Sequence, residues 1–249
     1  MEPQQTLGFA HFLAQSDIVG KTIFVMLLVM SLLSWYLIIA KSLQALLARR
    51  RTARFLAMFW NAPSLSAVER HLEEHHPDEP FSHLAYHSIA SSRHHARHGV
   101  NKLNEAGSAS EFLTRSMRRV IDEETARLES GLTILGSVGS TAPFVGLFGT
   151  VWGVYHALVN IGMSGQGTLD KVAGPVGEAL IMTGAGLAVA VPSVLAYNAF
   201  VRSNRVVLAK LDAFAHDLFS FLTTGSHLGE IQPSEIPRSV PKVVKAAGA

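Results

Sequence analysis

Three long apolar runs dominate the pattern of hydrophobic and polar positions along this chain. Residues 22–40, 130–169 and 179–201 contain no Asp, Glu, Lys or Arg. Each run is at least as long as the roughly 18 to 20 apolar residues that cross the hydrocarbon core of a bilayer. Since a backbone in lipid must satisfy its own hydrogen bonds, each crossing is expected to be a helix. The pattern therefore predicts an all-α integral membrane protein with three transmembrane helices, and it disfavours the buried core helices of a soluble enzyme.

Positively charged residues predict the orientation of these helices. They cluster after the first and third runs, whereas only Lys21 and Lys171 stand near the opposite ends. By the positive-inside rule, the clustered side faces the cytoplasm, the N-terminus lies outside and the C-terminus lies inside. Because the basic cluster follows the first run instead of preceding it, that run is expected to be an anchor and not a cleavable signal. The clusters are Lys41, Arg49, Arg50, Arg51 and Arg54, then Arg202, Arg205 and Lys210.

Prolines and charges predict the order of segments. Prolines within 61–63 and 76–80 interrupt the cytoplasmic stretch. No proline lies between positions 81 and 142, so one helix is expected from near Ser110 to Asn160, and the third helix continues to a C-cap at Gly225. The expected segments are a periplasmic N-terminus (1–20), transmembrane helix 1 (21–41), a cytoplasmic helical domain (42–129), transmembrane helix 2 (130–160), a short periplasmic turn (161–177), transmembrane helix 3 (178–201), a cytoplasmic helix extension (202–225) and a flexible cytoplasmic tail (226–249).

Composition narrows the classes of function. Apolar residues make up 48% of the chain and charged residues 16%, and the net charge of +2 is too small to predict a nucleic-acid partner. The absence of cysteine excludes disulfides and thiolate metal sites. No phosphate-binding loop, nucleophile elbow, zinc-protease motif or dinucleotide fingerprint occurs, so neither an enzyme nor a cofactor is expected.

Histidines gather in the cytoplasmic stretch, at spacings that place two imidazoles on one helix face. Two interpretations remain open. The pairs could hold a metal ion, or they could lie on an exposed basic helix near the anionic phospholipids of the inner leaflet. No metal ligand is assigned. The pairs are His71 with His75, His83 with His87, and His94 with His98.

Glu178 is the candidate for proton chemistry. It opens the third apolar run, and an acid at or inside the membrane edge is costly unless it faces water or a partner. Desolvation raises the pKa of a carboxyl, which lets such a group hold and release a proton near neutral pH. The alternative is an acid near a helix N-terminus that the helix dipole and the headgroups stabilise.

Small and hydroxyl residues recur at helical spacing in the second and third runs. They could form packing seams in which helices approach closely, or their hydroxyls could line a narrow polar lumen. Thr150 and Thr183 are the candidates for the lumen. Glu178 and Thr183 are five residues apart, about 140° around an ideal helix, so they share a direction only if the helix is irregular. The candidates for packing are Gly139, Gly146, Gly153, Gly186 and Ala190.

Residues 142–153, which read Ala-Pro-Phe-Val-Gly-Leu-Phe-Gly-Thr-Val-Trp-Gly, resemble the signature of the ExbB/TolQ/MotA proton-channel family. The similarity extends over about residues 130–205 and agrees with three spans. The sequence departs from the family at Gly174-Pro175, where relatives usually have Pro-Gly, and at Gly177, which is commonly Ala. The matching positions in the third run are 172–173, 178–180, 183–184, 186–187, 190–192 and 197–198.

The resemblance implies a homo-pentamer in a bacterial inner membrane whose second and third helices surround a lumen. That lumen would hold an ExbD-like single-span partner with a membrane Asp, and proton flow would drive motion passed to a TonB-like periplasm-spanning protein. Glu178, Thr150 and Thr183 match the family's polar lumen positions. The ExbB branch is favoured over the TolQ branch of the Tol–Pal system. A non-conducting membrane scaffold remains the alternative of a different class.

Overall fold

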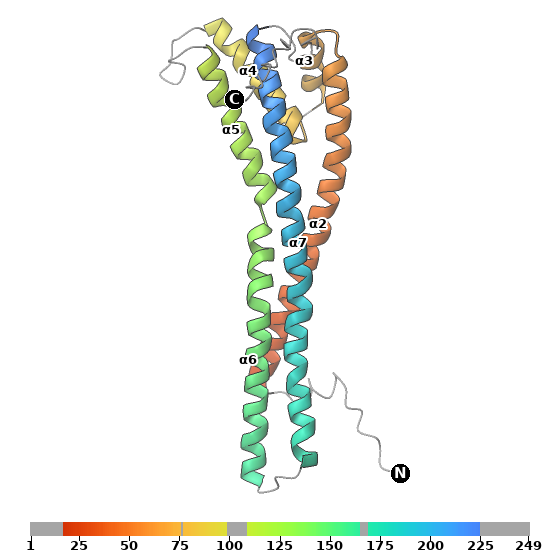
Figure 1. Ribbon diagram of the computed structural model, residues 1–249, viewed down its shortest axis with the longest axis vertical. Helices are drawn as coiled ribbons and strands as arrows, with labels where there is room; N and C mark the ends of the chain where they lie inside the picture. Colours follow the sequence, from red (N-terminus) through yellow and green to blue (C-terminus); the bar gives the residue numbers. More distant parts are fainter. Residues whose placement is uncertain (1–16, 76, 99–108, 165–168, 225–249) are drawn as a thin grey trace, which may run out of the picture. The chain divides into compact units, whose positions relative to one another are not determined.

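The computed structural model describes residues 17–75, 77–98, 109–164 and 169–224, and their secondary structure is entirely helical (Figure 1). Three stretches are long and apolar enough to cross a membrane: Ile18–Asn61, Ala109–Met163 and Ala179–Thr224. The all-α fold with three candidate spans, predicted from the apolar runs, is therefore confirmed. The predicted tail (226–249) and Gly225 lie outside the described residues, as do residues 1–16. The helices are α2 (Ile18–Asn61), α3 (Leu65–Glu74), α4 (Pro80–His98), α5 (Ala109–Glu129), α6 (Leu132–Ser164) and α7 (Leu169–Thr224).

Side-chain caps fix the starts of the helices in the first third of the chain. The Asp17 carboxylate accepts a hydrogen bond from the Gly20 N–H at 2.8 Å and caps α2, and Ser64 caps α3. Glu79 accepts hydrogen bonds from two N–H groups at the start of α4. These acceptors satisfy donors that have no partner within a helix. α2 ends at Asn61, two residues before the proline that predicted a break.

The single helix expected from Ser110 to Asn160 is broken, which corrects that prediction. α5 ends at Glu129 and α6 begins at Leu132. Between them Gly131 has a φ of 75°, the left-handed conformation that glycine adopts at the end of a helix. Gly131 is a residue at which a helix can end, but the prediction followed the apolar spacing that continues on both sides of it.

Two side chains satisfy the backbone at this break. The Leu128 carbonyl accepts hydrogen bonds from Lys41 Nζ at 2.9 Å and from Asn204 Nδ2 at 2.8 Å. Lys41 belongs to α2 and Asn204 to α7, so the C-terminus of α5 is tied to both other long helices. A cation at a helix C-terminus is also favourable to the helix dipole.

α7 begins earlier than the sequence predicts. Residues 169–177, expected to belong to the periplasmic turn, are helical, and only 165–168 of the expected turn fall outside the described residues. The prediction placed the start of this helix at the edge of the apolar run. Charged residues mark the edge of the hydrocarbon, however, and do not by themselves end a helix, so the helical hydrogen bonds continue past that edge.

The first of two compact units comprises Met1–Ala62 and Asp122–Ala209. Within it, α2, α6 and the first part of α7 pack side by side (Figure 1). Leu27, Val138, Ala142 and Ala190 form a buried cluster contributed by all three helices. A second cluster joins Ile23 to Met182.

The second unit comprises Pro63–Ile121 and Lys210–Ala249. It holds α3, α4, most of α5 and the end of α7, and its core includes Leu84, Leu211 and Leu218, each fully buried. The rings of Phe81 and Phe214 lie 5.6 Å apart between α4 and α7. This unit is a helical domain with an apolar core of its own.

Glycines allow α6 and α7 to approach closely. A Cβ at Gly146 would lie 2.6 Å from the Met182 carbonyl oxygen and 3.0 Å from the Gly186 Cα. A Cβ at Gly186 would lie 2.7 Å from the Ala142 carbonyl oxygen. Because these neighbours are backbone atoms that cannot rotate away, both positions require glycine. The other small residues singled out from the sequence lie along the same contact: Gly139 faces Val194, Gly153 faces Ala179, and Ala190 is buried in the three-helix cluster.

We expect Gly131→Ala to destabilise the protein by about 1 to 2 kcal/mol, since an L-residue is strained in the left-handed conformation. Thermal unfolding of the purified protein in detergent should show a lower Tm. Gly184→Ala is the matched control, because a Cβ at Gly184 meets nothing within 4 Å. Equal Tm values for the two variants would contradict this account of the break.

Gly146→Leu should separate α6 from α7 and reduce the yield of folded protein more than Thr150→Val, which nearly conserves volume. Gly162→Leu is the control on the same helix, where a Cβ has open space. Size-exclusion chromatography in detergent measures the yield of monodisperse protein. A Gly146→Leu variant that behaves like Gly162→Leu would exclude a close seam.

Candidate functional site

The hydroxyls of Thr150 and Thr183 meet between α6 and α7. Their Oγ1 atoms lie 2.5 Å apart, so one hydroxyl donates to the other. The Thr150 hydroxyl also lies 3.2 Å from the carbonyl oxygens of Gly146 and Ala179. Thr150 is buried and Thr183 half-buried. The structure thus brings together two of the three residues that the sequence singled out for proton movement.

Packing of the glycine seam positions this pair. Gly146 lies one helical turn before Thr150 and lets the α7 backbone approach, which brings the Ala179 carbonyl within reach of the hydroxyl. Thr150 points into the contact between the two helices. Its hydroxyl has one proton and three neighbouring oxygens that can accept it. The hydroxyl can therefore change its hydrogen-bond partner, and it introduces no fixed charge.

Glu178 lies on α7, but its side chain is outside the described residues. The backbone is helical from Leu169 through Thr183 without a break. The backbone positions of Glu178 and Thr183 are therefore about 140° apart around the helix. The next residue, Ala179, is buried against α6 and gives its carbonyl to Thr150. The structure places Glu178 within one residue of this contact, on a different face of α7 from Thr183.

A second buried hydroxyl pair joins α2 to α7. Ser193 donates a hydrogen bond to Ser34 at 2.9 Å, and both side chains are almost completely buried. Ser193 is one of the small and hydroxyl residues that recur at helical spacing in the third run, whereas sequence reasoning missed Ser34. Ser34 could have been found as a hydroxyl in an otherwise apolar run, because a buried polar group without a hydrogen bond there costs free energy.

Sequence reasoning also missed a polar cluster at the start of α2. The Asp17 carboxylate accepts a hydrogen bond from Trp152 Nε1 at 2.7 Å, and its Oδ2 atom lies 3.8 Å from His156 Nε2. Both partners are on α6. A carboxylate placed before the first span and a histidine within an uncharged run were the signals that could have indicated it.

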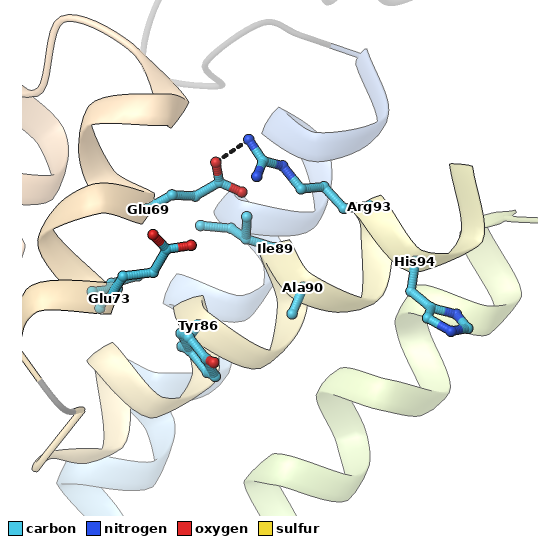
Figure 2. Close-up of a pocket in the computed structure, with 8 residues that line it drawn as sticks. Glu69, Glu73, Tyr86, Ile89, Ala90, Arg93 and His94 are labelled. Atoms are coloured by element: carbon cyan, nitrogen blue, oxygen red, sulfur yellow. Dashed lines mark ion pairs between the residues drawn. The ribbon is translucent and has the colours of Figure 1, made fainter. Parts of the chain in front are cut away.

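The second unit contains a pocket of about 260 Å³ between α3 and α4. Figure 2 shows Glu69 and Glu73 of α3 on one wall, with Arg93 of α4 forming an ion pair with Glu69. His94 points away from the two acids (Figure 2). This pocket contains no residue that the sequence assigned to proton movement.

Two of the three histidine pairs form ring contacts among the described residues. The rings of His71 and His75 stack with centroids 4.6 Å apart, and those of His83 and His87 meet edge to face. The His98 side chain lies outside the described residues. Among the described residues, no three His, Asp or Glu side chains are arranged to hold a metal ion.

Comparison with known proteins agrees with this architecture. Residues 87–213 match the model of the MotA/TolQ/ExbB proton channel family. The chain is 42% identical over 230 residues to biopolymer transport protein ExbB of Xanthomonas campestris pv. campestris (strain B100), which covers 89% of this chain and 91% of that protein. It is 43% identical over 197 residues to the ExbB of Neisseria meningitidis serogroup A, covering 79% and 88%.

The similarity extends to another branch of the family. The Tol-Pal system protein TolQ of Pseudomonas aeruginosa is 31% identical over 218 residues, which covers 88% of this chain and 94% of that protein. The matched family model includes α6, with its signature block and Thr150, and the part of α7 that carries Glu178 and Thr183. With three candidate spans and relatives aligned over most of its length, this chain belongs to the MotA/TolQ/ExbB proton channel family.

Proposed function

We propose that this chain is the proton-channel and stator subunit of an inner-membrane motor that energises TonB-dependent transport across the outer membrane. The observation that carries the proposal is the set of contacts of the Thr150 hydroxyl with α7, which reach the Thr183 hydroxyl and the carbonyl of Ala179, the residue after Glu178. The ExbB proteins of Xanthomonas campestris and Neisseria meningitidis are 42–43% identical to this chain, whereas the TolQ of Pseudomonas aeruginosa is 31% identical, which supports the ExbB branch. A TolQ-like subunit of the Tol–Pal system is the alternative within the family.

In this proposal Glu178 takes up and releases the proton, while Thr150 and Thr183 hold the water along which it moves. Hydroxyls keep a narrow passage hydrated without trapping an ion. The driving force is about 2.3 kcal/mol per 100 mV for each proton, so the passage must offer only low barriers. An ExbD-like single-span partner would supply the second acid and pass its motion to a TonB-like protein.

Exposed apolar side chains on the single chain support assembly into a ring, which we propose to be a pentamer. On α6, Phe144 is 71% exposed, and Val151 and Tyr155 are each 59% exposed. Faces of this kind require lipid or another protein chain. In the proposed ring they contact neighbouring copies and lipid, and the ring encloses the partner helix.

The proposed topology places the N-terminus in the periplasm and the C-terminus in the cytoplasm. Arg49, Arg50 and Arg51 are exposed on α2, beyond its apolar stretch. Basic side chains there would bind anionic phospholipids of the cytoplasmic leaflet, each contributing about 1 kcal/mol.

A membrane scaffold that only assembles partners is the second candidate. It is favoured by the burial of Thr150 within the α6–α7 contact, where a hydroxyl can serve packing alone. Proton flux into liposomes that contain this chain with and without its partner separates the two functions. Flux that depends on the partner supports the motor, and no flux in either preparation contradicts it.

Glu178→Ala should abolish energy transduction while leaving membrane insertion and oligomerisation intact, because it removes the proposed proton carrier. Iron-siderophore uptake by cells that express the variant with its partners measures the loss. Glu73→Ala, which removes an acid from the pocket of the second unit, is the control and should support uptake. Retained uptake by Glu178→Ala would exclude this role for Glu178.

The double variant Thr150→Val and Thr183→Val should assemble normally with its partner and still fail to energise uptake. In a packing seam the lost hydrogen bond is worth only about 0.6 kcal/mol, whereas in a lumen the water is replaced by an apolar wall that can dewet. Thr141→Val is the matched control, since the exposed Thr141 hydroxyl donates to the Ser137 carbonyl of its own helix. Wild-type flux in the double variant would identify both threonines as packing residues.

A further inference from the structure

The cluster of Asp17, Trp152 and His156 joins the start of α2 to α6. One Asp17 oxygen caps α2 by accepting from the Gly20 N–H at 2.8 Å, and the other accepts from Trp152 Nε1 at 2.7 Å. The carboxylate therefore serves two helices at once. His156 lies one turn beyond Trp152 on the same face of α6.

His156 is held close to both of its neighbours, but its hydrogen bonds are incomplete. Its ring centroid is 4.7 Å from that of Trp152, with 36° between the ring planes, and Nε2 is 3.8 Å from Asp17 Oδ2. This separation is too long for a hydrogen bond but short enough for an ion pair. Among the residues that the structure describes, the buried Nδ1 atom has no hydrogen-bond partner. In its neutral form the imidazole makes few stabilising interactions here. In its protonated form it would be attracted by the Asp17 carboxylate and by the face of the Trp152 indole.

Asp17 is ionised throughout the range in which an imidazole titrates. Burial raises the pKa of Asp17, whereas the hydrogen bonds from Gly20 and Trp152 lower it. The charge of His156 lowers it further, and the pKa of the carboxyl lies below its ordinary value. A lowered carboxyl pKa affects stability only in acid, below the range of about pH 5 to 8 in which imidazoles gain a proton.

Other titratable groups surround this cluster. On α6 the Tyr155 ring lies 5.5 Å from that of His156, and on α2 the exposed Lys21 follows one turn after Asp17. α7 carries Asp170, Lys171 and Glu178 along the same part of the unit, with side chains outside the described residues. An experiment must therefore separate His156 from these groups.

We propose that His156 is a proton-binding site, distinct from the Thr150–Thr183 contact, and that its protonation locks the start of α2 against α6 through Asp17 and Trp152. The added proton turns a 3.8 Å approach into an ion pair and places a cation beside the indole. Deprotonation removes this ion pair and leaves the indole–carboxylate hydrogen bond as the polar link of the cluster between the two helices. The site does not depend on whether Thr150, Thr183 and Glu178 conduct.

Trp152 itself provides the measurement. The chain has three tryptophans, and Trp35 and Trp60 are both exposed, so Trp35→Phe with Trp60→Phe leaves Trp152 as the sole indole. A protonated imidazole beside an indole quenches its fluorescence. In the full chain in detergent, Trp152 emission should fall as the pH is lowered from about 8 to 5. His156→Gln should abolish this transition, and Asp17→Asn should move its midpoint to lower pH, because it removes the negative charge beside the imidazole.

The controls assign the titrating group. Glu178→Gln in the same background should retain the transition, and its loss there would overturn the proposal. A transition that survives in His156→Gln, or one that is absent from the parent protein, would also overturn it. If Asp17→Asn does not fold, NMR of the wild-type chain labelled with ring-¹³C histidine provides the test. The resonance that His156→Gln removes must titrate between about pH 5 and 8, and a resonance that stays constant contradicts the proposal.

Discussion

The backbone contact between α6 and α7 depends on the absence of side chains at Gly146 and Gly186. Each glycine faces a carbonyl oxygen of the opposite helix at a distance that no Cβ could occupy. Lipid offers no hydrophobic driving force between helices, so such contacts are stabilised by close packing and by hydrogen bonds across them. The Thr150 hydroxyl reaches both Thr183 and an α7 carbonyl only because the backbones are this close. The seam and the polar site are therefore one structure.

Two hydroxyl pairs within the apolar helices of the first unit join neighbouring helices. Ser34 and Ser193 join α2 to α7, and Thr150 and Thr183 join α6 to α7. An unpaired hydroxyl in hydrocarbon is costly, so each pair also favours one rotation of its helices over others. Apolar packing alone specifies only weakly how far one long helix is shifted or rotated against its neighbour. These hydroxyl pairs fix that relative position.

Much of this fold is predictable from the sequence, because lipid imposes a simple rule on uncharged runs of sufficient length. That rule identifies the three candidate spans, and the signature around Thr150 identifies the family. The rule does not locate helix ends, since hydropathy falls at the membrane edge whether or not the helix continues. The start of α7 at Leu169 and the break at Gly131 were missed for this reason. The partners of Asp17, more than 130 positions away in the chain, are set by packing between helices and are not encoded in local spacing.

The break at Gly131 also affects how the chain tolerates changes in length. A residue inserted into a continuous helix turns everything beyond it by about 100°. Between α5 and α6 the helix stops and restarts, and the Leu128 carbonyl is held by side chains of α2 and α7. An insertion in α5 therefore need not rotate the glycine face of α6 away from α7. α7 is helical without a break from Leu169 to Thr224, so one residue inserted beyond Ser193 would turn Phe214 by about 100° around this helix relative to Gly186. A change of length is therefore expected to disturb the packing of α7 more than that of α5.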